Sequence, residues 1–200
     1  MKKIYDPFIV IVDATNKDKI EDIEFYVDAV LSHHKFNNKD GYQEDFVFIE
    51  FGEKLQIVNR SLVGQFSGTM LDFGDKFDLN DAVDYALKIQ EKLLEVYAKK
   101  QIDHLGFKFL LLVDKCPKDK YRFNSLIDEL NYAAERIITI PLSKNISLDE
   151  DISSTFSNSV INTSYLDEFF DYFFSEYLDS NNHEKVKLEF DPKELDDVEL

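Results

Sequence analysis

The chain has 200 residues, 44% of them hydrophobic, which is enough for one domain with a sizeable core. Its 40 Asp and Glu residues outnumber 23 Lys and Arg residues, so the formal net charge is −17 at pH 7. This charge argues against binding to nucleic acid or to an anionic membrane, because both are negatively charged. The single cysteine, Cys116, excludes an intrachain disulfide and fits a reducing cytoplasm.

The first half of the chain alternates between strand and helix patterns. Residues 8–12, FIVIV, form the continuous apolar run expected of a parallel strand that is covered on both faces. We expect this strand, and no signal peptide, at the N-terminus. Residues 18–34 have apolar side chains at helical spacing. Residues 46–51, FVFIEF, are predicted to form a second strand, with 54–58 as its hairpin partner.

The second half continues the alternation. Residues 59–78 are expected to be irregular, and a long helix is predicted over 78–99. The most apolar strand, KFLLLV at 108–113, is expected at the centre of the sheet. A short helix over 122–134 and a strand over 136–142 follow. No apolar run approaches the roughly 20 residues that a membrane-spanning helix needs.

The last part of the chain is predicted to close the domain and to end in a tail. Residues 159–163 are predicted as a short strand or an extended link, and 165–178 as a helix whose aromatic stripe packs in the core. The acidic segment 179–200 is expected to be partly disordered. The sequence therefore predicts one α/β domain over 1–178, a three-layer sandwich with a mainly parallel sheet and one antiparallel hairpin strand.

Polar residues follow two of the predicted strands. Asp13, Thr15, Asn16 and Lys17 come directly after the first strand, and Asp114 comes directly after the strand 108–113. Carboxyl ends of parallel strands meet at one edge of a sheet, which is where open α/β proteins bind ligands. The sequence therefore predicts a functional site at this edge.

The order of these segments resembles the von Willebrand factor type A domain family over residues 5–178. The pieces that carry the resemblance are the apolar first strand that ends in Asp, the hairpin FVFIEFGEKLQIV, the helix DLNDAVDYAL, the central strand that ends in Asp, the late strand RIITIPL and the closing helix YLDEFFDYFF. The resemblance implies a Rossmann-like fold. It also implies a metal-ion-dependent adhesion site, in which loop oxygens hold Mg²⁺ or Mn²⁺ for a partner's carboxylate.

The signature of that site is degraded in this sequence. Where the family has Asp-x-Ser-x-Ser, the chain has Asp13, Thr15 and Lys17, and an ammonium cannot ligate a metal. Depending on the alignment, Phe77 or Thr69 stands at the family's threonine position.

The third element of the signature keeps Asp114 and Pro117 but has Lys115 between them and lacks the family's Thr and Gly. Two lysines have therefore entered a site that should hold a dication. We hypothesise that the ammonium of Lys17 lies between Asp13 and Asp114 and replaces the metal. Two alternatives stay open: that Mg²⁺ or Mn²⁺ is held by Asp13, Thr15 and Asp114, or that these groups only cap helices and strand ends.

The resemblance implies a non-enzymatic, cytoplasmic protein-interaction module or scaffold without a cofactor. Its partner would present an acidic side chain or a basic surface to the predicted binding residues, which are Asp13, Thr15, Asn16, Lys17, Thr69, Asp114 and Lys115. The alternative is a receiver-like phospho-signalling domain or a small metal-dependent hydrolase that uses Asp13 and Asp114.

Overall fold

The structure, a computed structural model, describes residues 4–37, 42–61 and 66–142. In these ranges the strands are β1 (Ile4–Asp13), β2 (Tyr42–Phe51), β3 (Leu55–Ser61), β4 (Phe107–Val113) and β5 (Ala134–Pro141). The helices are α1 (Ile20–Asn37), α2 (Leu79–Lys100) and α3 (Lys120–Ala133), with short 3-10 turns η1 (Lys17–Lys19) and η2 (Gly68–Met70).

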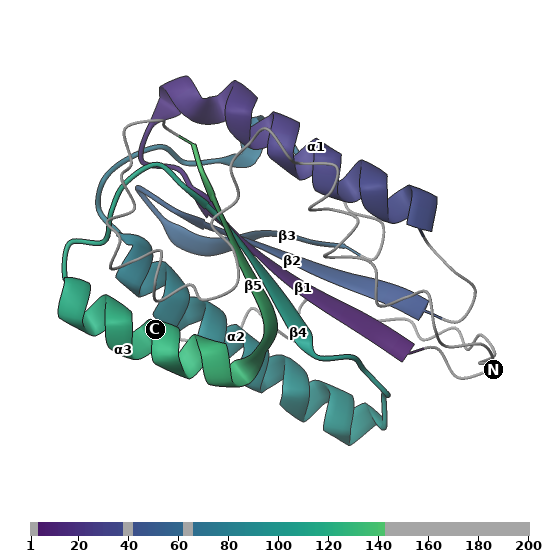
Figure 1. Ribbon diagram of the computed structural model, residues 1–200. Coiled ribbons are helices and arrows are strands. Elements are labelled where there is room, and N and C mark those ends of the chain that lie inside the picture. The colour runs from purple at the N-terminus through teal and green to yellow at the C-terminus, as the bar shows by residue number, and fades with distance from the viewer. Residues whose placement is uncertain (1–3, 38–41, 62–65, 143–200) are drawn as a thin grey trace.

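The described strands form one sheet in the order β3-β2-β1-β4-β5. All neighbouring pairs are parallel except the hairpin β2–β3, which is antiparallel. Helix α1 covers one face of the sheet, and α2 and α3 cover the other (Figure 1). This is the predicted three-layer α/β fold with one antiparallel hairpin strand. Within the described strands the middle position belongs to β1, and not to β4 as the sequence suggested, because β1 pairs with β2 and β4.

The alternation of side chains along β1 builds two cores. Ile9 and Ile11 point into the cluster beneath α2 and α3, whereas Phe8, Val10 and Val12 point into the cluster beneath α1. All five side chains are almost completely buried. A strand that is covered on both faces needs apolar residues at every position, which explains the unbroken FIVIV run.

Side-chain caps fix where the helices on the second face begin. Asp78 accepts hydrogen bonds from the N–H groups of Asn80 and Asp81, and the Asp81 carboxylate accepts one from the Asp78 N–H. Asp119 caps α3 by accepting hydrogen bonds from the N–H groups of Tyr121 and Arg122. These caps satisfy backbone N–H groups in the first turn of each helix and so fix where both helices start.

Some sequence predictions fall outside the described residues. These are the strand or link at 159–163, the helix at 165–178 and the tail at 179–200. Among the described helices, none combines the length and the apolar composition that crossing a membrane requires.

Candidate functional site

The candidate site lies at the carboxyl edge of the parallel strands and consists of three loops, 13–17, 72–78 and 114–118, which we call the rim. Asp13, the last residue of β1, is completely buried there. Its Oδ1 accepts the N–H of Thr15 at 2.9 Å. Its Oδ2 accepts the N–H groups of Asp114 at 2.8 Å and Lys115 at 3.0 Å. One carboxylate therefore ties the first rim loop to the third.

The electrostatics of Asp13 follow from these contacts. Burial raises the pKa of Asp13 above its ordinary value, while the Thr15 hydroxyl and the three N–H donors act in the opposite direction. The buried Thr15 Oγ1 lies near enough to the Asp13 carboxylate to stabilise its ionised form. It has no hydrogen-bond partner of good geometry among the described residues. Asp13 therefore serves as an internal acceptor whose two oxygens both receive backbone donors.

Asn16 makes a second link between the same two loops. Its Nδ2 donates to Oδ2 of Asp114 at 3.1 Å, across 98 positions of sequence. Its Oδ1 accepts the N–H of Asp18 at 3.1 Å and so caps η1. Both ends of the amide thus have a partner.

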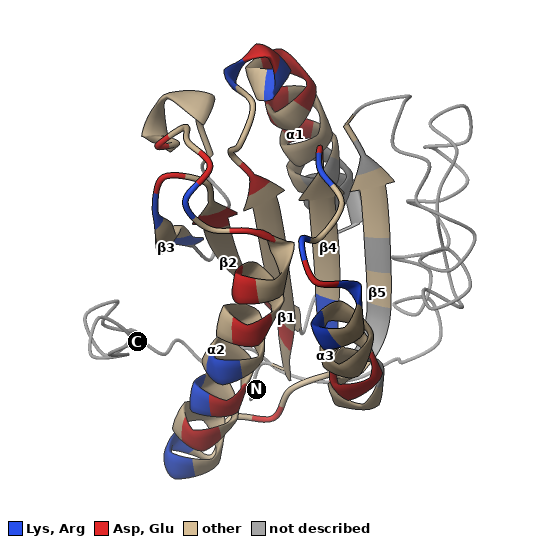
Figure 2. Ribbon diagram, turned by 90° about the vertical axis from the view of Figure 1, so that its left-hand side faces the viewer, with Lys and Arg blue, Asp and Glu red and all other residues tan. Residues whose placement is uncertain are grey.

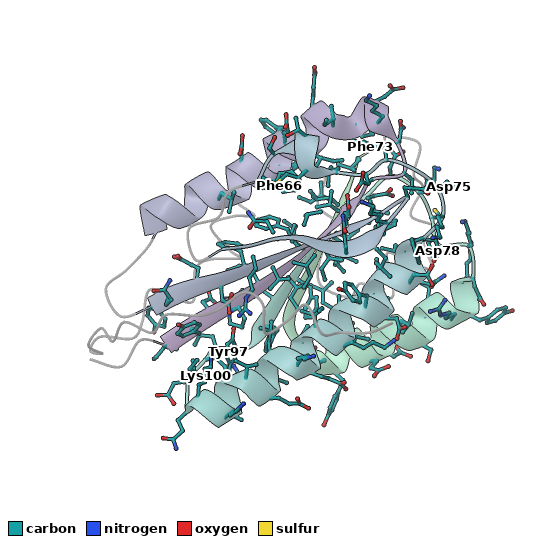
Figure 3. All side chains as sticks on the ribbon, turned by 180° about the vertical axis from the view of Figure 1, so that it is seen from behind. Phe66, Phe73, Asp75, Asp78, Tyr97 and Lys100 are labelled. Carbon is teal, nitrogen blue, oxygen red and sulfur yellow. The ribbon has the colours of Figure 1, made fainter. Side chains whose placement is uncertain are left out.

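The middle rim loop joins the third through charged groups. Asp75 lies 3.4 Å from the Lys115 Nζ and 4.0 Å from the Lys118 Nζ, and Asp78 accepts the Lys118 N–H at 3.2 Å. Figure 3 shows Asp75 and Asp78 at the end of the molecule opposite to Tyr97. Asp75 is not among the site residues predicted from the sequence, because no local pattern marks it.

Two glycines allow the loops to approach closely. The Gly74 N–H donates to the Ala14 carbonyl at 3.1 Å. A Cβ at Gly52 would lie 2.6 Å from that same carbonyl oxygen, and a Cβ at Gly74 would lie 2.7 Å from the Cβ of Glu53. Larger residues at either position would push the loops apart.

Five of the predicted site residues meet at the rim, and they are Asp13, Thr15, Asn16, Asp114 and Lys115. Lys17 is exposed at the start of η1 and forms no ion pair with Asp13 or Asp114. The hypothesis that its ammonium lies between the two carboxylates is therefore wrong. The physical reason is that neutral backbone N–H groups satisfy Asp13, while the Asn16 amide binds Asp114.

Thr69 is not part of the rim. It belongs to η2, where its Oγ1 lies 2.9 Å from the Ser67 Oγ, and the neighbouring Gly68 N–H donates to Glu24 of α1 at 2.7 Å. Phe77, which the other alignment places at the family's threonine, packs against the core beneath α2. Neither position supplies a hydroxyl to the rim.

The side chains of the rim do not fit the Mg²⁺ or Mn²⁺ ion that a metal-ion-dependent adhesion site would hold. A hard divalent cation needs about six oxygen ligands around it. The oxygens of Asp13 already accept three N–H groups, and the ammonium of Lys17 cannot ligate a metal ion. Within the described residues, no three His, Cys, Asp or Glu side chains come together as a ligand set. The rim loops instead form a surface that is fixed by hydrogen bonds and carries exposed lysine side chains.

The exposed charges of the rim differ from those of the whole chain. Lys17, Lys76, Lys115 and Lys118 are all exposed on its loops, beside the exposed Asp75. Figure 2 shows this mixture of basic and acidic positions in the loops at the strand ends. The rim is therefore a place where a chain of net charge −17 presents cations to solvent.

Comparisons with known proteins agree with this geometry at the level of the fold. No family model and no curated protein sequence matches the chain. Among solved structures, the N-terminal domain of TFIIH p34 matches with a TM-score of 0.54 and 13% identity, over 86% of this chain and 97% of that one. A von Willebrand factor type A protein from Catenulispora acidiphila matches with a TM-score of 0.54 and 10% identity, over 88% and 43%.

The ArnB paralog VWA2 from Sulfolobus acidocaldarius matches with a TM-score of 0.50 and 19% identity, over 83% of this chain and 43% of that one. The chain thus spans less than half the length of two of these three proteins. The order of the described strands, the hairpin β2–β3 and these likenesses lead to the same conclusion about the fold. The chain has the fold of von Willebrand factor type A domains.

Proposed function

We propose that this protein is a non-enzymatic protein-interaction module that binds its partner through the rim and needs no metal ion to do so. The observation that carries the proposal is the double link between the first and third rim loops, made by Asp13 and Asn16. A surface whose loops are already fixed loses little conformational freedom on binding. The von Willebrand factor type A fold supports a role in protein interactions by analogy.

The charges of the rim define the chemistry of the partner. Lys115 and Lys118 share the carboxylate of Asp75 as an ion-pair partner, and the side chains of both lysines remain exposed. Lys17 adds a further exposed ammonium, which forms no ion pair with any of the residues that the structure describes. A partner that presents Asp or Glu side chains would complement these groups.

The alternative of a phospho-signalling domain or hydrolase receives less support from the same contacts. A carboxylate that attacks phosphorus or activates water needs an oxygen that faces the substrate. Asp13 is completely buried, and both of its oxygens accept backbone N–H groups. Its role in the proposal is structural. The lone exposed thiol of Cys116 fits the cytoplasmic location that we propose for the protein.

Cys116 makes the proposal directly testable, because it is the only thiol of the chain and lies exposed in the third rim loop. A photoreactive maleimide attached to Cys116 would capture a partner bound at the rim from a lysate of the source organism. As a control, the double variant Cys116→Ser/Lys99→Cys moves the thiol to the exposed last turn of α2, at the opposite end of the molecule. We expect a specific cross-linked product only from the first position.

A charge reversal then tests whether the lysines make the contact. Lys17→Glu should reduce the yield of the cross-linked product, because it places a carboxylate opposite the partner's acidic groups. The matched control is Lys99→Glu, which makes the same change in net charge far from the rim. Equal cross-linking from both thiol positions, or equal loss in both reversals, would contradict binding at the rim.

A further inference from the structure

The link between Asn16 and Asp114 suggests more than a hydrogen bond between two loops. In the adhesion site that the fold family implies, a cation joins the oxygens of separate loops. In this chain the residues do not fit such an ion, yet the first and third loops are still joined at the same edge of the sheet. We propose that the side-chain amide of Asn16 has taken the place of the ion as the cross-link of the rim.

The polarity of the contacts supports this assignment. The first loop offers a carboxylate, Asp13, to the backbone donors of the third loop, and it offers a donor, the Asn16 Nδ2, to the carboxylate of Asp114. The exchange is reciprocal, like the paired contacts of a capping box. Because Asp114 receives a donor that belongs to the chain itself, an external cation is not required to hold that carboxylate beside the first loop.

The bond also lies in a setting where it can act as a cross-link. Asp114 and Asn16 are both half-buried, and the contact joins segments 98 residues apart. The other end of the amide is held by the Asp18 N–H, so the Nδ2 cannot turn away from Asp114 without losing the η1 cap. Asn16 is thus a positioning residue for the rim.

The substitution Asn16→Asp tests the hydrogen-bond donor alone, because it removes the Nδ2 and leaves the size and shape of the side chain nearly unchanged. A carboxylate at position 16 keeps the acceptor for the Asp18 N–H but replaces the donor with a negative charge about 3 Å from Asp114. We expect this variant to melt about 3–8 °C below the wild type in EDTA. In the variant, the carboxylate at position 16 and that of Asp114 lie side by side near Thr15, and together they provide oxygen ligands for a divalent cation. Millimolar Mn²⁺ or Mg²⁺ should therefore restore most of the loss in the variant and should not raise the melting temperature of the wild type.

Two further variants keep the test decisive. Asn124→Asp adds the same charge on the exposed face of α3, outside the rim loops, and should show neither the loss nor the response to metal. The swap Asn16→Asp/Asp114→Asn restores an amide facing a carboxylate with the opposite polarity. It should regain at least half of the lost melting temperature in EDTA and should no longer respond to Mn²⁺.

Three results would overturn the proposal. In the first, Mn²⁺ or Mg²⁺ stabilises the wild type as strongly as it stabilises Asn16→Asp. In the second, Asn16→Asp is as stable in EDTA as Asn124→Asp. In the third, the swap is no more stable in EDTA than Asn16→Asp alone. All these measurements use the purified chain without a partner. They therefore succeed or fail independently of the proposed protein-binding function.

Discussion

Lys108 on β4 and Asp6 on β1 form an ion pair of 2.7 Å in which both side chains are completely buried. The pair lies on the α1 side of the sheet, where the Lys108 Nζ is also 5.1 Å from the centre of the Phe8 ring. It joins residues that are 102 positions apart, and it lies toward the amino ends of strands whose carboxyl ends carry the rim. This contact therefore helps to fix the alignment of β1 with β4, on which the rim loops depend.

Removal of one member of this pair should destabilise the fold strongly. Asp6→Asn removes the negative charge that lies 2.7 Å from the buried Lys108 ammonium, and breaking a buried ion pair in this way typically costs about 3–5 kcal/mol. The double variant Asp6→Leu/Lys108→Met removes both charges and should regain most of that free energy. Urea denaturation of the three proteins measures the difference. A single variant as stable as the wild type would show that the pair does not hold the strands.

A second buried contact fixes α2 on the sheet. Asp45 accepts the Tyr97 hydroxyl at 2.7 Å and the Arg60 guanidinium at 2.6 Å and 3.0 Å, and burial beside Asp45 raises the pKa of Tyr97. Tyr97→Phe should lower the free energy of unfolding by about 1–3 kcal/mol, because Asp45 loses one donor inside the protein. Tyr132→Phe is the matched control, since Tyr132 is 96% exposed. Equal stability of the two variants would contradict this role of the hydrogen bond.

The fold could be predicted from the sequence to a large extent because its signals are local. The FIVIV run of β1 and the apolar stripe of α2 follow from the spacing of side chains within one element. The position of β1 in the middle of the described sheet could not be read in this way. Strand order depends on which strands pair with each other, and β1 and β4 are similarly apolar, so their hydrophobicity does not show which of them lies in the middle. The helix at 165–178 stays a prediction.

The candidate site was predictable only in part for a similar reason. Asp13 and Asp114 were found because each ends an apolar strand. The bridging role of Asn16 depends on a loop 98 residues away, so that no spacing within the first loop reveals it. The same holds for Asp75, whose partners lie in another loop. The position of Lys17 could not be predicted because backbone N–H groups, and not a side-chain cation, satisfy the Asp13 carboxylate.

A buried carboxyl gives the protein a distinctive dependence on pH. Glu50 is completely buried, and burial raises its pKa above the ordinary 4.5 despite hydrogen bonds from the Asp72 N–H and the Gln56 amide. The folded state then binds the proton more tightly than the unfolded state. The contribution of Glu50 to stability is therefore fully present below pH 4.5 and is lost as the pH rises through the raised pKa.

The variant Glu50→Gln cannot ionise and should lack this dependence. We expect the stability of the variant relative to that of the wild type to increase as the pH rises from 4 to 7, in steps of about one pH unit. Chemical denaturation at each pH measures the free energy of unfolding of both proteins. A difference that stays constant or decreases over this range would show that the folded-state pKa of Glu50 is not raised.

Lys17 should matter for binding and not for stability. Its side chain is exposed and forms no ion pair within the described part of the chain, so Lys17→Glu should change the free energy of unfolding by no more than about 0.5 kcal/mol. Thermal melting of the variant checks this directly. A loss well beyond that value would mean that Lys17 supports the rim itself, and any loss of partner capture in this variant would then have to be assigned to misfolding.

The central claim is that the rim is held together by its own hydrogen bonds and not by a metal ion. Paramagnetic Mn²⁺ tests it most directly, because it broadens the NMR signals of amides close to where it binds. In a titration of the ¹⁵N-labelled wild-type protein, we expect the amides of Thr15, Asp114 and Lys115, which donate to Asp13, to broaden no more than those of α2. Selective loss of these three signals at low Mn²⁺ would place an ion at the rim and contradict the account.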